Sequence, residues 1–265
     1  MKTELDTFLK MDISEAVNKI DKENVDYFLL LDELGKFTRD TIGNVKIDSE
    51  DGLKIIISCL VIKAMNTLEA VVRLSRACLI SEAKALLRVL IEVLIIIRCI
   101  EADPSYLDRY IGAFKVDRKK RLELIVSNPE YFFDFLDDAE IPHYNKIKAE
   151  IEDEIRTRKI YEKKTGQWAN KAGLKELYEI PYRLFCADVH VGVQILENYL
   201  SRDQEGNLKS LIVRPFDEIE IKAILHHAFD LFSMALQSHL AILGIESLEF
   251  AEIWAKRVAI SRIEG

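Results

Sequence analysis

The chain of 265 residues is 49% hydrophobic and 31% charged, enough for one sizeable core, yet it holds only 10 glycines and 5 prolines. Because strand-rich folds need many turns, which favour glycine and proline, this composition favours helices. The net charge of −8 argues against general nucleic-acid binding, since phosphate contacts need local positive charge.

Helical periodicity predicts an all-α fold, a helical bundle in a single domain over residues 1–265. One or two helices are expected within residues 1–45. The core, about residues 53–243, is expected to be a bundle of helices, and a last amphipathic helix at 247–262 packs on it. The core helices are expected near 53–79, 82–101, 181–200 and 216–243.

Between these core helices, a charged helix near 143–163 carries only a thin apolar stripe. Such a narrow stripe is typical of a peripheral or projecting helix. A short aromatic and acidic segment precedes it, between Pro129 and Pro142. Residues 201–215 are expected to form a polar linker, in which 208–213 has the composition of a short strand without an evident pairing partner.

The N-terminal residues lack a basic region followed by an apolar core, so we expect no signal peptide. The most apolar segment, 85–100, is shorter than the roughly 20 residues that a membrane span needs. The four cysteines lack metal-ligand or disulfide-framework spacing. We therefore expect a cytoplasmic protein with reduced thiols, no structural metal and no cofactor. The cysteines are Cys59, Cys78, Cys99 and Cys186.

A charged pair, Arg88 and Glu92, lies one turn apart in the helix that is apolar nearly all round, and Lys84 extends the same stripe. One interpretation is a salt bridge on the solvent-facing edge, worth a few tenths of a kcal/mol. The other is a buried pair that faces a cavity or a subunit interface. A buried ion pair rarely adds stability over apolar packing, so burial favours a role in function or specificity.

A second stripe consists of Tyr178, Tyr182, Cys186 and His190, which recur every fourth residue. On a helix this spacing places two phenols, a thiol and an imidazole along one face. Helix packing is one interpretation. The other is a polar pocket in which His190 acts as an acid, a base or an anion ligand.

Three groups of residues, in chain order, carry a family resemblance. They are Leu87-Arg88 with Glu92, Asp103-Pro104 with Tyr110, and Trp168 leading to Tyr178, Tyr182 and His190. Over about residues 53–200 the chain resembles an uncharacterised bacterial family catalogued as domain of unknown function 5677. The family pattern has serine where this chain has Cys186, which weakens any role for a hydroxyl there. The resemblance implies an all-helical fold and supplies no mechanism.

A looser similarity is to HEPN-like helical proteins, many of which are metal-independent ribonucleases of toxin or antiphage defence systems. Their motif has an arginine four to six residues ahead of a histidine. Arg183 and His190, with six intervening residues, fit its loose end. The resemblance implies that Arg183 stabilises the transition state and His190 acts as acid and base, while Arg88 and Glu92 orient them.

Two function classes therefore stay open. One is a HEPN-like ribonuclease, and the other is a noncatalytic sensor or scaffold that binds a small anionic ligand or a partner protein. We expect a homodimer, because several helices carry more apolar surface than one bundle hides. The basic run Arg118-Lys119-Lys120-Arg121 is interpreted as a solvated face, and His226, His227 and Asp230 as an incomplete metal set.

Overall fold

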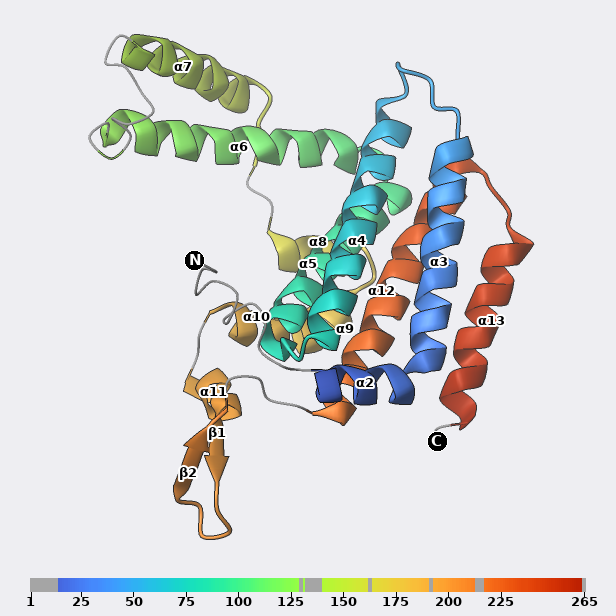
Figure 1. The fold of residues 1–265 in the computed structure, drawn as a ribbon. Helices are drawn as coiled ribbons and strands as arrows, with labels where there is room; N and C mark the ends of the chain where they lie inside the picture. Colours follow the sequence, from blue (N-terminus) through green and yellow to red (C-terminus); the bar gives the residue numbers. More distant parts are fainter. Residues whose placement is uncertain are drawn as a thin grey trace, which may run out of the picture.

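The computed structural model describes residues 14–128, 131, 140–161, 164–190, 193–212 and 217–263 (Figure 1). Helices dominate these residues, so the predicted all-α class is confirmed. The helices of the N-terminal and central part are α2 (Ser14–Glu23), α3 (Val25–Asn44), α4 (Gly52–Arg76), α5 (Ile80–Ala102), α6 (Tyr106–Ser127) and α7 (Ile141–Thr157). The remaining elements are α8 (Thr165–Lys171), α9 (Lys175–Leu177), the π-helix η3 (Tyr178–Tyr182), α10 (Arg183–Val189), α11 (Val193–Leu196), the 3₁₀-helix η4 (Glu197–Tyr199), β1 (Leu200–Arg202), β2 (Leu208–Leu211), α12 (Glu218–Leu243) and α13 (Leu248–Ile263).

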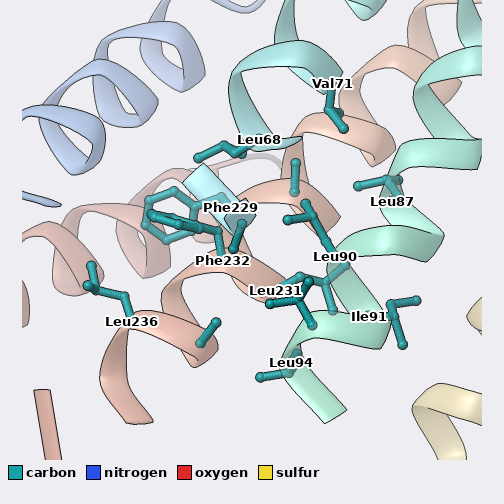
Figure 2. Packing of buried hydrophobic residues seen from close by; sticks show 14 of the residues in the cluster. Leu68, Val71, Leu87, Leu90, Ile91, Leu94, Phe229, Leu231, Phe232 and Leu236 are labelled. Carbon is teal, nitrogen blue, oxygen red and sulfur yellow. The ribbon is translucent and has the colours of Figure 1, made fainter. Parts of the chain in front are cut away.

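The core lies where α4, α5 and α12 pack against one another. Figure 2 shows Leu87, Leu90 and Leu94 of α5 facing side chains of both neighbouring helices. Because α5 also packs against α8 and α10, it is buried on nearly all sides, as its apolar composition predicts. Partners from the other two helices include Leu68, Val71, Phe229, Phe232 and Leu236.

The charged helix is peripheral, as predicted. Helices α6 and α7 form a hairpin that projects from the bundle (Figure 1). Ion pairs join the two helices, from Lys115 to Glu154 and from Lys119 to Glu152, the second at 3.5 Å. The chain passes close to α6 at Gly112, where an added Cβ would lie 3.0 Å from Ile160. Ion pairs and the few buried apolar side chains of both helices therefore hold the hairpin together.

The prediction of a single helix near 181–200 is wrong. The chain instead forms the π-helix η3, which contains Pro181, followed by the short helix α10. Proline has no N–H to donate to the preceding turn, which favours a local departure from α-helical bonding. Helix α10 ends at His190, whose backbone angles (φ −105°, ψ 40°) are not helical.

The predicted polar linker at 201–215 is also partly wrong, since it contains most of a β-hairpin. The expected strand exists as β2, and its partner is β1, which pairs with it antiparallel. Sequence reasoning missed β1 because it spans the boundary between the helix that was expected to reach 200 and the linker that was expected to begin at 201. The hairpin projects away from the bundle (Figure 1).

By length and composition alone, α4 is apolar enough to cross a membrane, the one such helix among the described residues. Core helices of globular proteins meet the same criterion, and α4 packs between α5 and α12. The expectations for residues 1–13 and for most of the aromatic segment between Pro129 and Pro142 fall outside the described residues.

Candidate functional site

Helix α5 and the η3–α10 segment lie side by side and run in opposite directions. Tyr182, at the start of the segment, contacts Arg88 and Glu92 in the middle of α5. Asp188, near its end, interacts with Ser81 and Lys84 near the start of α5. This packing places the second polar stripe of the sequence against the first.

Arg88, Tyr182 and Glu92 form a closed polar triad. Arg88 Nη2 donates to the Tyr182 hydroxyl at 3.1 Å, and this hydroxyl donates to Glu92 Oε1 at 2.8 Å. Arg88 Nη2 also lies 3.1 Å from Glu92 Oε1. The Arg88 and Glu92 side chains are 25% and 30% exposed, so the pair is half-buried, between the two interpretations that the sequence left open.

Arg88 and Tyr182 keep their protons near neutral pH. Burial works against the charge of Arg88, but the hydrogen bond to Tyr182 and the charge of Glu92 raise its pKa above the ordinary value. Burial, together with the Glu92 carboxylate, raises the pKa of Tyr182 to about 12. Tyr182 therefore stays protonated and acts as a donor that holds Glu92 in place.

Aromatic stacking extends the triad toward solvent. The Arg88 guanidinium lies 5.1 Å from the centre of the Tyr182 ring, and Tyr182 stacks on Tyr178 at 4.9 Å between ring centres. Arg183 lies 5.7 Å from the Tyr178 ring. Gly166 of α8 faces the same ring so closely that an added Cβ would lie 2.9 Å from Tyr178 Cε1. The result is a row in which two stacked phenol rings lie between two guanidinium groups.

The two residues expected to be catalytic, Arg183 and His190, are both exposed, but the structure does not bring them together. Arg183 points back along its helix, where its Nη2 lies 3.1 Å from Glu179 Oε2. His190 lies two turns in the other direction, about 10 Å along the axis by helical rise. Cys186 is half-buried between them and interacts with Arg88, and its backbone carbonyl accepts the His190 N–H at 3.2 Å.

On the other side of η3–α10 lies an apolar groove that the sequence analysis missed. It has a volume of about 320 Å³ and runs between α5, η3–α10 and α12. Ile180 and Leu184 at its edge are 62% and 65% exposed. Ile180 and Leu184 lie one turn apart in the sequence, a spacing that could have indicated this groove. Because they flank the polar stripe, the sequence analysis made no prediction for them. The lining consists of Lys84, Leu87, Ile180, Pro181, Leu184, Phe185, Glu220, Ala223, Ile224 and His227.

The remaining candidate residues from the sequence are bonded to other residues of the chain. His227 Nδ1 lies 2.7 Å from the carbonyl of Ala223, and Asp230 pairs with Arg257 at 3.0 Å. Lys119 of the basic run pairs with acidic residues of α6 and α7. Within the described part of the chain, no three His, Cys, Asp or Glu side chains gather as metal ligands.

A comparison with protein families matches residues 54–208 to DUF5677, a family of unknown function. The match covers more than half of the chain. The protein belongs to the DUF5677 family. Comparisons with curated proteins and with solved structures gave no match.

The residues that carried the resemblance to DUF5677 lie around one helix, α5. Besides the triad, Trp168 of α8 accepts a hydrogen bond at its carbonyl from the thiol of Cys99 in α5, at 3.1 Å. The Trp168 ring meets Tyr106 edge to face at 5.2 Å. Asp103 closes this corner through an ion pair with Lys171 at 3.7 Å. These motif residues therefore fix α8, η3 and the start of α6 onto the central helix.

Proposed function

We propose that this DUF5677 protein is a noncatalytic scaffold that binds an apolar segment of a partner protein in the groove between α5, η3–α10 and α12. The observation that carries this proposal is the exposure of Ile180 and Leu184 beside an apolar groove. Contiguous exposed apolar surface of this kind typically marks an interaction site.

The composition of the surrounding surface fits protein recognition. Tyrosine and arginine are enriched among the residues that dominate binding energy in protein interfaces, where they sit beside apolar contacts. The row of Arg88, Tyr182, Tyr178 and Arg183 lies directly behind the groove wall formed by η3 and α10. Because this row is bonded internally, it holds the wall in one conformation before a partner binds, which reduces the entropic cost of binding.

A small anionic ligand is less well supported by the same contacts. The two guanidinium groups are already paired, Arg88 with Glu92 and Arg183 with Glu179. An anion would have to share either guanidinium with a carboxylate that repels it. An apolar segment displaces only water from Ile180 and Leu184, which is favourable at roughly 25 cal/mol per Å² of apolar area buried.

The groove suits an amphipathic helix, whose apolar anchors recur at i, i+3, i+4 and i+7. A fluorescent peptide with leucine at these positions provides a probe for anisotropy titration. The wild-type protein should bind it, and Leu184→Asp should weaken binding by at least about tenfold, or 1.4 kcal/mol. Leu124→Asp is the matched control, because Leu124 is 59% exposed on the distant α6. Equal affinity in both variants would refute binding in the groove.

The ribonuclease hypothesis has one observation in its favour, the exposure of Arg183 and His190 on the same short helix. Its test is incubation of pure protein with total RNA, with and without EDTA. If the hypothesis holds, wild-type protein should cleave RNA in EDTA, and His190→Ala and Arg183→Ala should not, although both variants fold. Intact RNA in every sample would reject the ribonuclease hypothesis and leave only the scaffold proposal.

A further inference from the structure

The β1–β2 hairpin has one apolar face. Its register pairs Leu200 with Leu211 and Arg202 with Leu208, and the bulge at Ser201/Arg202 puts one extra residue into β2. Without the bulge, Leu208 and Leu211 would point to opposite faces, because side chains alternate along a strand. The extra residue resets this alternation, so both leucines lie on the face of Leu200.

This apolar face is not covered within the described part of the chain. Leu208 and Leu211 are 59% and 73% exposed, and the opposite face carries Ser201 and Ser210. An isolated two-stranded hairpin is only marginally stable in water, and it usually needs further strands or a packed apolar face. A hairpin with one polar and one apolar face is therefore expected to have a partner that covers the apolar face.

We propose that a second copy of this chain supplies the cover, with the apolar face of each hairpin docked on the Ile180–Leu184 groove of the other copy. This inference rests on the groove of the proposed function and names its occupant. Each copy would give one projecting hairpin and receive another, so a two-fold axis relates two identical contacts.

A second copy of the chain fits as the partner because the same chain carries both halves of the contact between hairpin and groove. One half is a concave apolar groove, and the other is a projecting hairpin with exposed leucines. Other exposed apolar side chains lie between the end of α10 and β1 and at the start of α12. They are Val189, Val193, Leu196 and Ile219.

Charge is compatible with self-association, although each copy has a net charge of −8. Lys84 pairs with Glu220 at the groove, and Arg183 pairs with Glu179 beside it. At the hairpin, Arg202 of the apolar face pairs with Glu197 at 3.0 Å. These three pairs are neutral within the chain, so they add no repulsion between like charges when two copies meet there.

The test is the molar mass of the full-length protein, measured by sedimentation equilibrium over a range of concentrations. We expect twice the chain mass of 30.5 kDa. Leu211→Asp and Leu184→Asp should each yield monomers. Ser210→Asp is the matched control, since it places the same charge one residue away on the polar face, and it should remain dimeric. Circular dichroism melting of each variant verifies that it folds.

Mixing the two monomeric variants tests the reciprocal contact. The Leu211→Asp copy keeps an intact groove and the Leu184→Asp copy keeps an intact hairpin, so the mixture should form a dimer with one good contact. A mixture that stays monomeric would overturn docking of hairpin on groove. A wild-type monomer, or dimers in both single variants, would overturn the inference.

The two proposals fail separately. The Leu211→Asp variant keeps the groove, so the peptide titration on this variant tests the scaffold proposal alone. Peptide binding to a protein whose wild type is monomeric would keep the scaffold proposal and reject the second copy. A mixed dimer without peptide binding would keep the second copy as the occupant and reject a general site for partner helices.

Discussion

At the residue scale, the Tyr182 hydroxyl bridges the polar triad, since it accepts a hydrogen bond from Arg88 and donates one to Glu92. Tyr182→Phe keeps the ring and its stacking but removes both hydrogen bonds. We expect the free energy of unfolding to fall by about 1–2 kcal/mol, the range for hydrogen bonds to charged groups that are partly exposed. Urea denaturation measures this change.

Tyr178→Phe is the control for this prediction. It keeps the ring that stacks on Tyr182 and loses a hydroxyl outside the triad. Its expected effect is below about 0.5 kcal/mol, as for a substitution that removes no buried partner. If the two variants lost equal stability, the two hydrogen bonds of the Tyr182 hydroxyl would contribute nothing measurable to holding η3 on α5.

A second prediction concerns His239, which is fully buried in α12 with Nε2 3.0 Å from the Ser58 hydroxyl of α4. Burial lowers its pKa to about 4. Because the unfolded chain takes up this proton near pH 6.5, unfolding becomes more favourable as pH falls from about 6.5 to 4. The loss of stability should reach about 3 kcal/mol and then level off, since below pH 4 both states bind the proton.

Carboxylates also titrate in this range, so the measurement is a difference between two proteins. The pH dependence of unfolding is followed for wild type and for His239→Asn, which keeps a polar side chain without the titration. The wild-type curve should be steeper between pH 6.5 and 4. Parallel curves would show that His239 is protonated in the folded protein.

At the element scale, the α6–α7 hairpin depends on charges that cross between its helices. Lys115→Glu places two carboxylates together at Glu154 and should cost about 1 kcal/mol, the upper end for a partly exposed pair. The double swap Lys115→Glu with Glu154→Lys should recover most of this loss. Thermal denaturation of the three proteins measures the effect, and a double variant no better than the single one would show that Arg158 is the main partner of Glu154.

Helices with a strong period of 3.6 were predictable from the sequence. The apolar residues of α5 and α12 recur on nearly every side, which is typical of central helices. Gly244, which adopts a positive φ of 69°, marked the end of α12. These elements follow from local patterns that tertiary contacts only reinforce.

The region after Pro181 was not predictable in the same way. Residues 183–200 keep a helical pattern of apolar side chains, but the chain leaves the helix at His190 and later turns into β1. The strand is defined by pairing with β2, a non-local contact that periodicity does not register. The bulge that places both leucines on one face depends on the same pairing.

Part of the candidate site followed from spacing. Arg88 and Glu92, one turn apart on α5, meet Tyr182 of the second stripe because α5 packs against the η3–α10 segment with these faces together. The distance between Arg183 and His190 did not follow, because helical side chains lean toward the N-terminus and Arg183 reaches Glu179 instead. A shared helix face therefore indicates shared direction, but not contact.

At the scale of the whole molecule, the packing predicts a gradient of local stability. Helices α4, α5 and α12 hold the core, whereas the α6–α7 and β1–β2 hairpins project from it (Figure 1). Amide hydrogen exchange should be slowest in the three core helices and faster in both hairpins, because elements with few buried apolar contacts open locally at lower free energy.

The two hairpins should differ in one respect, which gives the last prediction. If a second copy covers the hairpin of β1 and β2, exchange of its amides should slow as protein concentration rises, because binding stabilises the closed form by mass action. Exchange in α7 should not change with concentration, since α7 packs and forms ion pairs with α6 of the same chain. Peptic fragments over 200–211 and 141–157 allow both to be measured in one sample by mass spectrometry. A concentration dependence of similar size in both fragments would indicate nonspecific association, and its absence from 200–211 would indicate a hairpin that stands alone in solution.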